Sequence, residues 1–221
     1  VLDYPTKFQL IRLGHRAVPA LMDQASVRDA GLRFETRSAL RYVAIHAAKD
    51  RMEAERAAQA ILPYLDQGRE AGVRAFAAEL LGEIRVPTTI GVLEAAASDP
   101  DMAVYGAALD AIVRFDRKTA IESIVRLDAS LDSRAPSARL VGAMGEMQDP
   151  RFTAGLAGLA KGGNEGLCLV AIGALGMSAD PAAAEALAGI AGSQTAESVK
   201  AAARAALQAL GEALLYEGRP E

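Results

Sequence analysis

The chain has 221 residues, 51% of them hydrophobic, which is enough to form a sizeable core. Its only cysteine, Cys168, excludes an internal disulfide and a zinc site built from cysteines. The net charge is −4, with eleven Lys/Arg against nine Asp/Glu in residues 1–70 and thirteen against nineteen in residues 71–221. Because a groove that follows a nucleic-acid backbone needs a basic majority along its length, this distribution argues against a nucleic-acid partner.

The hydropathy pattern argues against a membrane protein. No apolar run reaches the roughly 18 residues of a membrane helix, and no secretion signal is visible. We expect no membrane span and favour a cytoplasmic location. The first residue is Val1, so the sequence leaves a removed secretion signal open as the alternative.

The first third of the chain predicts helices at residues 4–13, 17–25, 32–48 and 51–66. In the first of them Phe8, Ile11 and either Leu13 or Leu10 are expected to face the core. Gly14 should end this helix, since glycine accepts the left-handed conformation at a helix terminus. Pro63 should end or kink the fourth helix near residue 62.

From Val73 onward a two-helix unit repeats along the chain. Equivalent positions are Val73, Val104, Pro136, Leu167 and Val199, at spacings of 31, 32, 31 and 32 residues. A repeat of this period predicts an all-α solenoid, in which each unit buries its apolar side only against its neighbours. We expect one domain over residues 1–221, with about six to seven helical hairpins, regular over 71–211 and looser over 1–70.

Turn and capping residues punctuate the repeats. Asp149-Pro150 and Asp180-Pro181 should each open the second helix of a unit, and Asp99-Pro100 should open a first helix, with the Asp as the cap. Asp116 is expected to cap without a proline. Three glycines occupy one equivalent position and should either let a neighbouring helix approach closely or let the chain turn: Gly82, Gly145 and Gly176. The first helix of the last unit, residues 196–210, should be followed by a separate capping helix and a polar tail.

Apolar pairs three residues apart mark the buried face of each second helix. The pairs are Ile90/Leu93, Ile121/Ile124, Leu156/Leu159 and Leu187/Ile190.

The repeated unit resembles the HEAT-repeat family, especially the short bacterial type also found in phycobilin lyases. The resemblance is carried by VRAFAAELLGEI at 73–84, ARLVGAMGEMQDP at 138–150 and VAIGALGMSADP at 170–181. It implies a right-handed α-α superhelix with first helices on a convex face and second helices on a concave one. It also implies a binding scaffold more often than a catalyst.

Arg33, Arg37 and Arg41 are four residues apart and therefore lie on one helix face. One interpretation is a stripe that binds an acidic or phosphorylated partner, because guanidinium groups bind oxyanions in a bidentate manner. The alternative is a solvated face with local carboxylate partners, in which Arg37 matches Arg74 and makes contacts between repeats.

The predicted concave face is the second candidate surface. Small residues at Gly91 and Ala157 would let a partner backbone come close, as in recognition of a helix in a groove. The charged residues expected at its rim are Glu94, Glu122, Arg126 and Glu185. The alternative is that the small residues serve only tight packing between layers.

The sequence carries no catalytic signature. His15, His46 and Glu83 are near equivalent repeat positions, but their spacing does not match a metal motif such as HExxH. The iron-binding HEAT enzymes that hydroxylate a modified lysine use repeated His-Glu pairs, which do not occur here. Cys168 lacks a partner base and is interpreted as a buried small residue. We expect no cofactor and no metal.

The leading functional hypothesis is a non-catalytic scaffold that binds a protein or peptide, as a monomer or weak oligomer. The alternative is a phycobilin-lyase-like protein that handles a linear tetrapyrrole, although aromatic residues make up only 5% of the chain. A third reading follows the HEAT-like DNA glycosylases, against which the acidic residues 71–221 argue.

Overall fold

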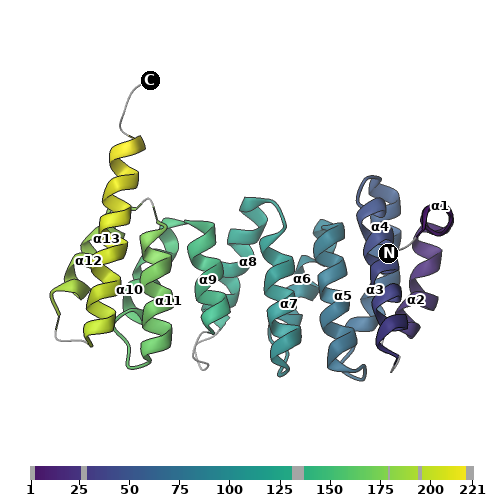
Figure 1. The fold of residues 1–221 in the computed structure, drawn as a ribbon, viewed down its shortest axis with the longest axis horizontal. Coiled ribbons are helices and arrows are strands. Elements are labelled where there is room, and N and C mark those ends of the chain that lie inside the picture. Colours follow the sequence, from purple (N-terminus) through teal and green to yellow (C-terminus); the bar gives the residue numbers. More distant parts are fainter. Residues whose placement is uncertain (1–2, 26–28, 131–136, 179, 194–195, 218–221) are drawn as a thin grey trace. The chain divides into compact units, whose positions relative to one another are not determined.

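A computed structural model of the chain describes residues 3–25, 29–130, 137–178, 180–193 and 196–217. Every regular element in these ranges is helical, and none is a strand (Figure 1). No helix in this part of the chain combines the length and the apolar character that a bilayer crossing requires. The predicted repeat start at Pro136 lies outside the described residues.

The helices form hairpins in chain order. The α-helices up to residue 130 are α1 (Tyr4–Leu13), α2 (Val18–Gln24), α3 (Ala30–Ala47), α4 (Arg51–Ile61), α5 (Ala71–Ile84), α6 (Ile90–Ala96), α7 (Met102–Val113) and α8 (Arg117–Ser130). They are followed by α9 (Ala138–Met147), α10 (Thr153–Leu159), α11 (Glu165–Gly176), α12 (Pro181–Ala191) and α13 (Glu197–Glu217). Short 3₁₀ turns are η1 (Gly14–Ala17), η2 (Leu62–Leu65), η3 (Pro87–Thr89) and η4 (Pro150–Phe152).

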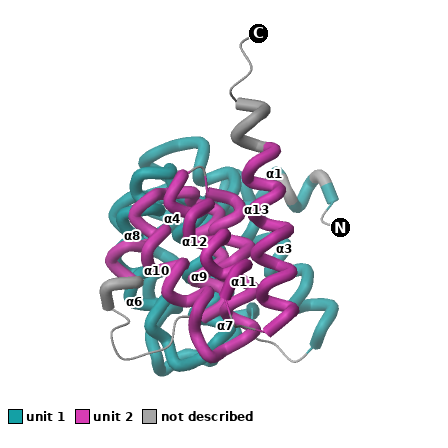
Figure 2. Tube along the Cα trace, turned by 90° about the vertical axis from the view of Figure 1, so that its left-hand side faces the viewer, with its two compact units in different colours: residues 1–123 teal, residues 124–221 magenta. Residues whose placement is uncertain are grey.

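The chain divides into two compact units, Val1–Ser123 and Ile124–Glu221 (Figure 2). In the first unit α1, α3, α5 and α7 pack in succession, and in the second unit α9, α11 and α13 do the same. We call these helices the outer layer. The helices that alternate with them, α2, α4 and α6 in the first unit and α10 and α12 in the second, form the inner layer. The expectation of one cooperative domain stays a prediction.

The core lies between the two layers and is densest around α5. Phe76, Leu80 and Leu81 of this helix are completely buried, because α3 and α7 cover it on either side. Most residues of the predicted apolar pairs are buried. Only Ile90 and Leu159 are half-buried. The completely or almost completely buried residues of this set are Leu93, Ile124, Leu156, Leu187 and Ile190.

The three equivalent glycines lie where outer-layer helices meet, as predicted. A Cβ added at Gly82 would lie 2.7 Å from the Cα of Ala111 on α7. One added at Gly145 would lie 2.7 Å from the Cβ of Ala174 on α11, and one at Gly176 would lie 3.0 Å from the Cβ of Ala206 on α13. Such distances leave no room for a side chain, so these helices pack backbone against backbone.

Carboxylates cap the helices, which accounts for part of the acidic excess. Asp149 and Asp180 accept backbone N–H groups at the starts of η4 and α12, and Asp116 accepts that of Thr119 in α8, as predicted. The prediction for Asp99 is wrong: Asp101 caps α7 by accepting from Ala103. Asp99 is buried instead and pairs with Arg74.

Two other predictions need correction at the ends of the chain. Gly14 does end α1, with a φ of +52°, but Phe8, Ile11 and Leu13 are exposed and only Leu10 is buried. The reason is that α1 has α3 as its only outer-layer neighbour among the described residues, so one narrow face is covered. At the other end α13 runs unbroken to Glu217 rather than stopping for a capping helix. Gly211 costs only about 1 kcal/mol within a run of good helix formers.

We predict that Gly82→Ala destabilises the protein, because the new methyl group collides with the backbone of α7. Overpacking costs about 1–3 kcal/mol, which outweighs the roughly 1 kcal/mol that alanine gains over glycine in a helix. The control is Gly106→Ala on α7, where an added Cβ meets no atom within 4 Å. This substitution should stabilise the protein slightly. Urea unfolding at neutral pH measures both; equal effects of the two substitutions would contradict the close approach.

Candidate functional site

The inner layer of the second unit exposes a surface made almost entirely of small residues. The exposed positions on α10 and α12 include Ala154, Gly155, Gly158, Ala182, Glu185, Ala188 and Gly189. A Cβ added at Gly158 or Gly189 would meet nothing within 4 Å, so these glycines face open space. Ala157, predicted for this surface, is half-buried on α10. A partner can therefore reach close to the backbone of both helices, and Glu185 supplies a negative charge there.

The other residues predicted for this face lie on α6 and α8. Gly91 is exposed on α6 with open space around it, and Glu94 lies half-buried one turn further along. Glu122 and Arg126 are exposed on α8, Glu122 in the first unit and Arg126 in the second. Ala157 and Glu185 lie on α10 and α12, which pack against each other. Each predicted inner-layer residue is thus at least partly accessible within its own unit.

The three predicted arginines lie on α3, in the outer layer of the first unit. Arg37 donates from Nε to the carbonyl of Ala25 at 3.4 Å and from Nη2 to that of Gly72 at 3.2 Å. Its guanidinium also lies 4.7 Å from the ring centroid of Phe76. Burial lowers the pKa of Arg37, opposed by Glu79 and reinforced by Arg33 and Arg41. Arg37 therefore serves contacts between helices, as the alternative interpretation of the stripe expects.

Arg41 also contacts the next outer helix. Its Nη2 lies 2.6 Å from Oε2 of Glu79 on α5, while half of the side chain stays exposed. Beside this pair is a cavity of about 450 Å³, whose far wall is formed by small residues of α7 such as Gly106. Arg33 is half-buried. Binding of an acidic partner to the stripe of Arg33, Arg37 and Arg41 stays a prediction.

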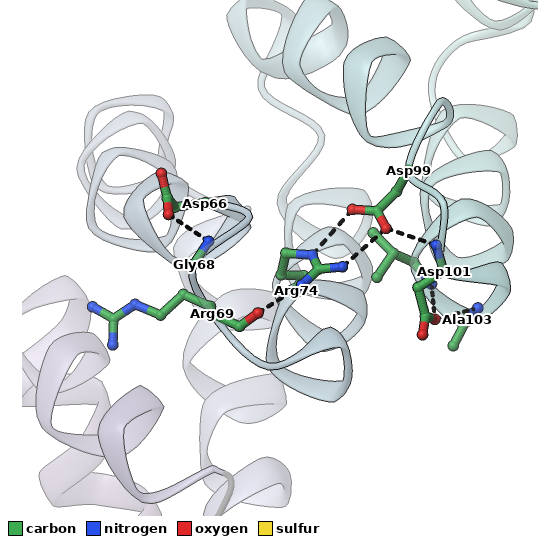
Figure 3. Close-up of polar contacts among 8 residues, drawn as sticks. Asp66, Gly68, Arg69, Arg74, Asp99, Asp101 and Ala103 are labelled. Carbon is green, nitrogen blue, oxygen red and sulfur yellow. Dashed lines mark hydrogen bonds and ion pairs between the residues drawn. The ribbon is translucent and has the colours of Figure 1, made fainter.

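A buried ion pair between Arg74 and Asp99 joins helix α5 to the loop between α6 and α7 (Figure 3). Nε and Nη2 of Arg74 donate to the two carboxylate oxygens of Asp99 at 3.0 and 2.9 Å, and Nη1 donates to the carbonyl of Arg69 at 2.6 Å. The same carboxylate accepts the backbone N–H of Asp101. The hydrogen bonds from Arg74 lower the pKa of Asp99 against the opposing effect of burial, and the pair raises the pKa of Arg74.

Sequence reasoning placed Asp99 wrongly because Asp-Pro is a common helix start. The usable signal was Arg74 itself, an arginine in an otherwise apolar helical run, since a buried arginine requires a carboxylate partner.

The two histidines lie in different surroundings. Nδ1 of His15 lies 2.9 and 3.0 Å from the two oxygens of Glu53, which also accepts the backbone N–H of His15. Burial would raise the pKa of Glu53, but the hydrogen bonds from His15 lower it. His46 instead lies beside Tyr42, with 5.0 Å between ring centroids. Within the described residues, no three His, Cys, Asp or Glu side chains are grouped to hold a metal.

Cys168 is buried at the start of α11, as its interpretation as a small core residue predicts. Its Sγ donates to the carbonyls of Gly162 at 3.1 Å and Leu159 at 3.4 Å. The thiol is therefore bonded to the loop that precedes its own helix.

Comparison with known proteins agrees with this architecture. Residues 58–138 match the family model described as HEAT repeats. The match confirms the resemblance to HEAT repeats over these residues. No curated protein sequence matches the chain.

Two solved structures share the fold of these HEAT repeats. An archaeal HEAT-like repeats protein from Thermococcus onnurineus NA1 is 15% identical, with a TM-score of 0.53 over 95% of this chain and 94% of that one. A designed armadillo repeat protein in complex with the peptide (KR)4 is 17% identical, with a TM-score of 0.52 over 87% and 99% of the two chains. The complex of CpcE and CpcF of phycocyanin lyase from Nostoc sp. PCC7120 is 17% identical over 86% and 98%, but its TM-score of 0.41 supports no argument.

We predict that Asp99→Asn lowers the free energy of unfolding at pH 7 by about 3 kcal/mol, because it leaves a buried guanidinium without its counter-charge. Since the pKa of Asp99 is lowered in the folded state, its ionised form stabilises the fold above the unfolded pKa, near 3.9. That stability is lost as the pH falls through the folded pKa. The difference from the parent protein should therefore shrink below about pH 4. Urea unfolding between pH 7 and pH 2 measures it; a constant difference would refute the role of the charge.

Proposed function

We propose that the protein is a non-catalytic scaffold whose inner layer binds a protein or peptide, with a preference for an extended, positively charged segment. The observation that carries this proposal is the exposed small-residue surface of α10 and α12, where Gly158 and Gly189 face open space beside Glu185. A partner backbone can approach such a surface without displacing long side chains.

Charge supports the preference for a basic partner. Glu122 on α8 and Glu185 on the inner-layer helix α12 are exposed, and neither caps a helix. Exposed carboxylates of one sign steer and select partners of the opposite sign. The designed armadillo repeat protein of similar fold is itself in complex with the peptide (KR)4. That likeness extends to the fold alone, and it makes (KR)4 a suitable first probe.

The alternative of a phycobilin-lyase-like protein has only the repeat type in its favour. The pocket beside Arg41 and the pocket around Arg56 are lined by no tyrosine. Titration with a linear tetrapyrrole followed by absorbance tests this alternative directly.

We predict that fluorescein-labelled (KR)4 binds saturably and that Glu185→Lys weakens this binding at least about five-fold, as expected for reversal of one contacting charge. Fluorescence anisotropy at moderate salt measures the affinity. The matched control is Glu146→Lys on α9, in the outer layer of the same unit, which changes the net charge equally.

The control should bind (KR)4 nearly as well as the parent protein. An equal loss in both variants would show that only net charge matters, and absence of saturable binding would remove the basic-peptide preference.

A further inference from the structure

A pocket of about 530 Å³ lies on the inner layer of the first unit. It is lined by Met52, Glu55, Arg56 and Gln59 of α4, together with His15 of η1 and Thr88 of η3. Because η1 leads into α2 and η3 leads into α6, the lining residues come from three successive hairpins of the first unit. The pocket lies on the layer that the proposed function assigns to partner binding, but its chemistry differs from that of α10 and α12.

Arg56 is the cation available in this pocket. It is exposed and makes no hydrogen bond or close ion pair with any described residue. The carboxylate whose pKa it helps to lower, Glu53, already bonds to the ring and the backbone of His15. The five N–H donors of its guanidinium are therefore open to a ligand from solution.

Neutral donors and an apolar wall surround this cation. Gln59 and Thr88 are exposed and carry an amide and a hydroxyl group that can donate to an oxyanion. Met52 is 62% exposed and offers a contact for an apolar neighbour of the bound group. His15 is held in place by both oxygens of Glu53, so one edge of the pocket is fixed.

The remaining charge in the pocket limits what the ligand can carry. Glu55 accepts a hydrogen bond from Nε of Arg51 at 3.2 Å and is half-exposed, so its negative charge is only partly compensated. The single cation of Arg56 compensates one negative charge on a ligand. A carboxylate is thereby neutralised, whereas a phosphoryl group of nearly two negative charges would keep an excess charge beside Glu55. The pocket therefore favours a singly charged oxyanion.

We propose that this pocket binds the carboxylate of an Asp or Glu side chain in a peptide, with an apolar neighbour of that residue against Met52. The inference rests on the proposed function, because it makes the pocket a selective subsite of the same inner layer. A partner would then combine a basic segment with an acidic residue next to an apolar one.

The test uses selection of peptides by the immobilised full chain. One library carries six randomised residues joined to (KR)4, and a second carries six randomised residues on a neutral linker. Selections are made with the parent protein, with Arg56→Gln and with Arg12→Gln, an exposed arginine of the same unit that does not line the pocket. The affinity of the best selected peptide is then measured for each variant by anisotropy.

We expect both libraries to become enriched in Asp or Glu beside an apolar residue. Arg56→Gln should abolish this enrichment and weaken the selected peptide about ten-fold, as loss of a charge-assisted hydrogen bond implies, while Arg12→Gln changes neither. Glu55→Gln should tighten binding, since it removes the competing charge. Binding of (KR)4 alone should not weaken in Arg56→Gln.

Each other outcome is decisive. Lack of acidic enrichment in both libraries, or enrichment that survives Arg56→Gln, overturns the subsite even if (KR)4 binds. The selected peptide is also made with Asp, Glu or phosphoserine at its acidic position. Tighter binding of the phosphoserine peptide overturns the assignment to a carboxylate. Failure of (KR)4 to bind the parent protein overturns only the preference for a basic segment. The library on the neutral linker contains no (KR)4, so it tests the pocket independently.

Discussion

The backbone contact between neighbouring outer helices is the constraint on which the rest of the structure depends. It is made where Gly82 meets Ala111 in the first unit and where Gly145 meets Ala174 in the second. A hairpin of two short helices cannot bury its own apolar face, so its stability comes from the next hairpin. Because a glycine faces an alanine at each of these points, the outer helices come close together, and Phe76 and Leu81 of α5 are completely buried.

Polar groups at one repeat position add a second constraint, because they tie each outer helix to its loops. Arg37 bonds to the carbonyls of Ala25 and Gly72, and Arg74, which matches it by alignment, bonds to Arg69 and Asp99. Cys168 stands at the equivalent place in the second unit and bonds to the preceding loop through its thiol. Three side chains at this repeat position thus donate hydrogen bonds to main-chain carbonyl groups near the start of an outer helix.

Helix positions and close contacts could be predicted from the sequence because they depend on local and periodic signals. The role of Gly82 and the burial of Leu93 both follow from the repeat period. The ion pair of Asp99 with Arg74 could not be predicted from the sequence. A helix cap and an ion pair with arginine both require a carboxylate, and only the fold decides which of the two Asp99 forms. Exposure of Phe8 depends on which neighbours cover α1. The pocket around Arg56 needs three hairpins at once, and no repeat pattern marks it.

The two layers differ in what their side chains are used for, and this difference explains why binding is assigned to the inner one. In the outer layer Arg41 pairs with Glu79, and Arg114 with Glu83 at 2.7 Å, so charges on the surface hold one helix to the next. A partner that bound there would compete with these pairs. On α10 and α12 the exposed positions are mostly alanine and glycine, which lose almost no side-chain entropy when a partner covers them. Glu185 and, in the first unit, Arg56 can then select the partner without first breaking an existing ion pair.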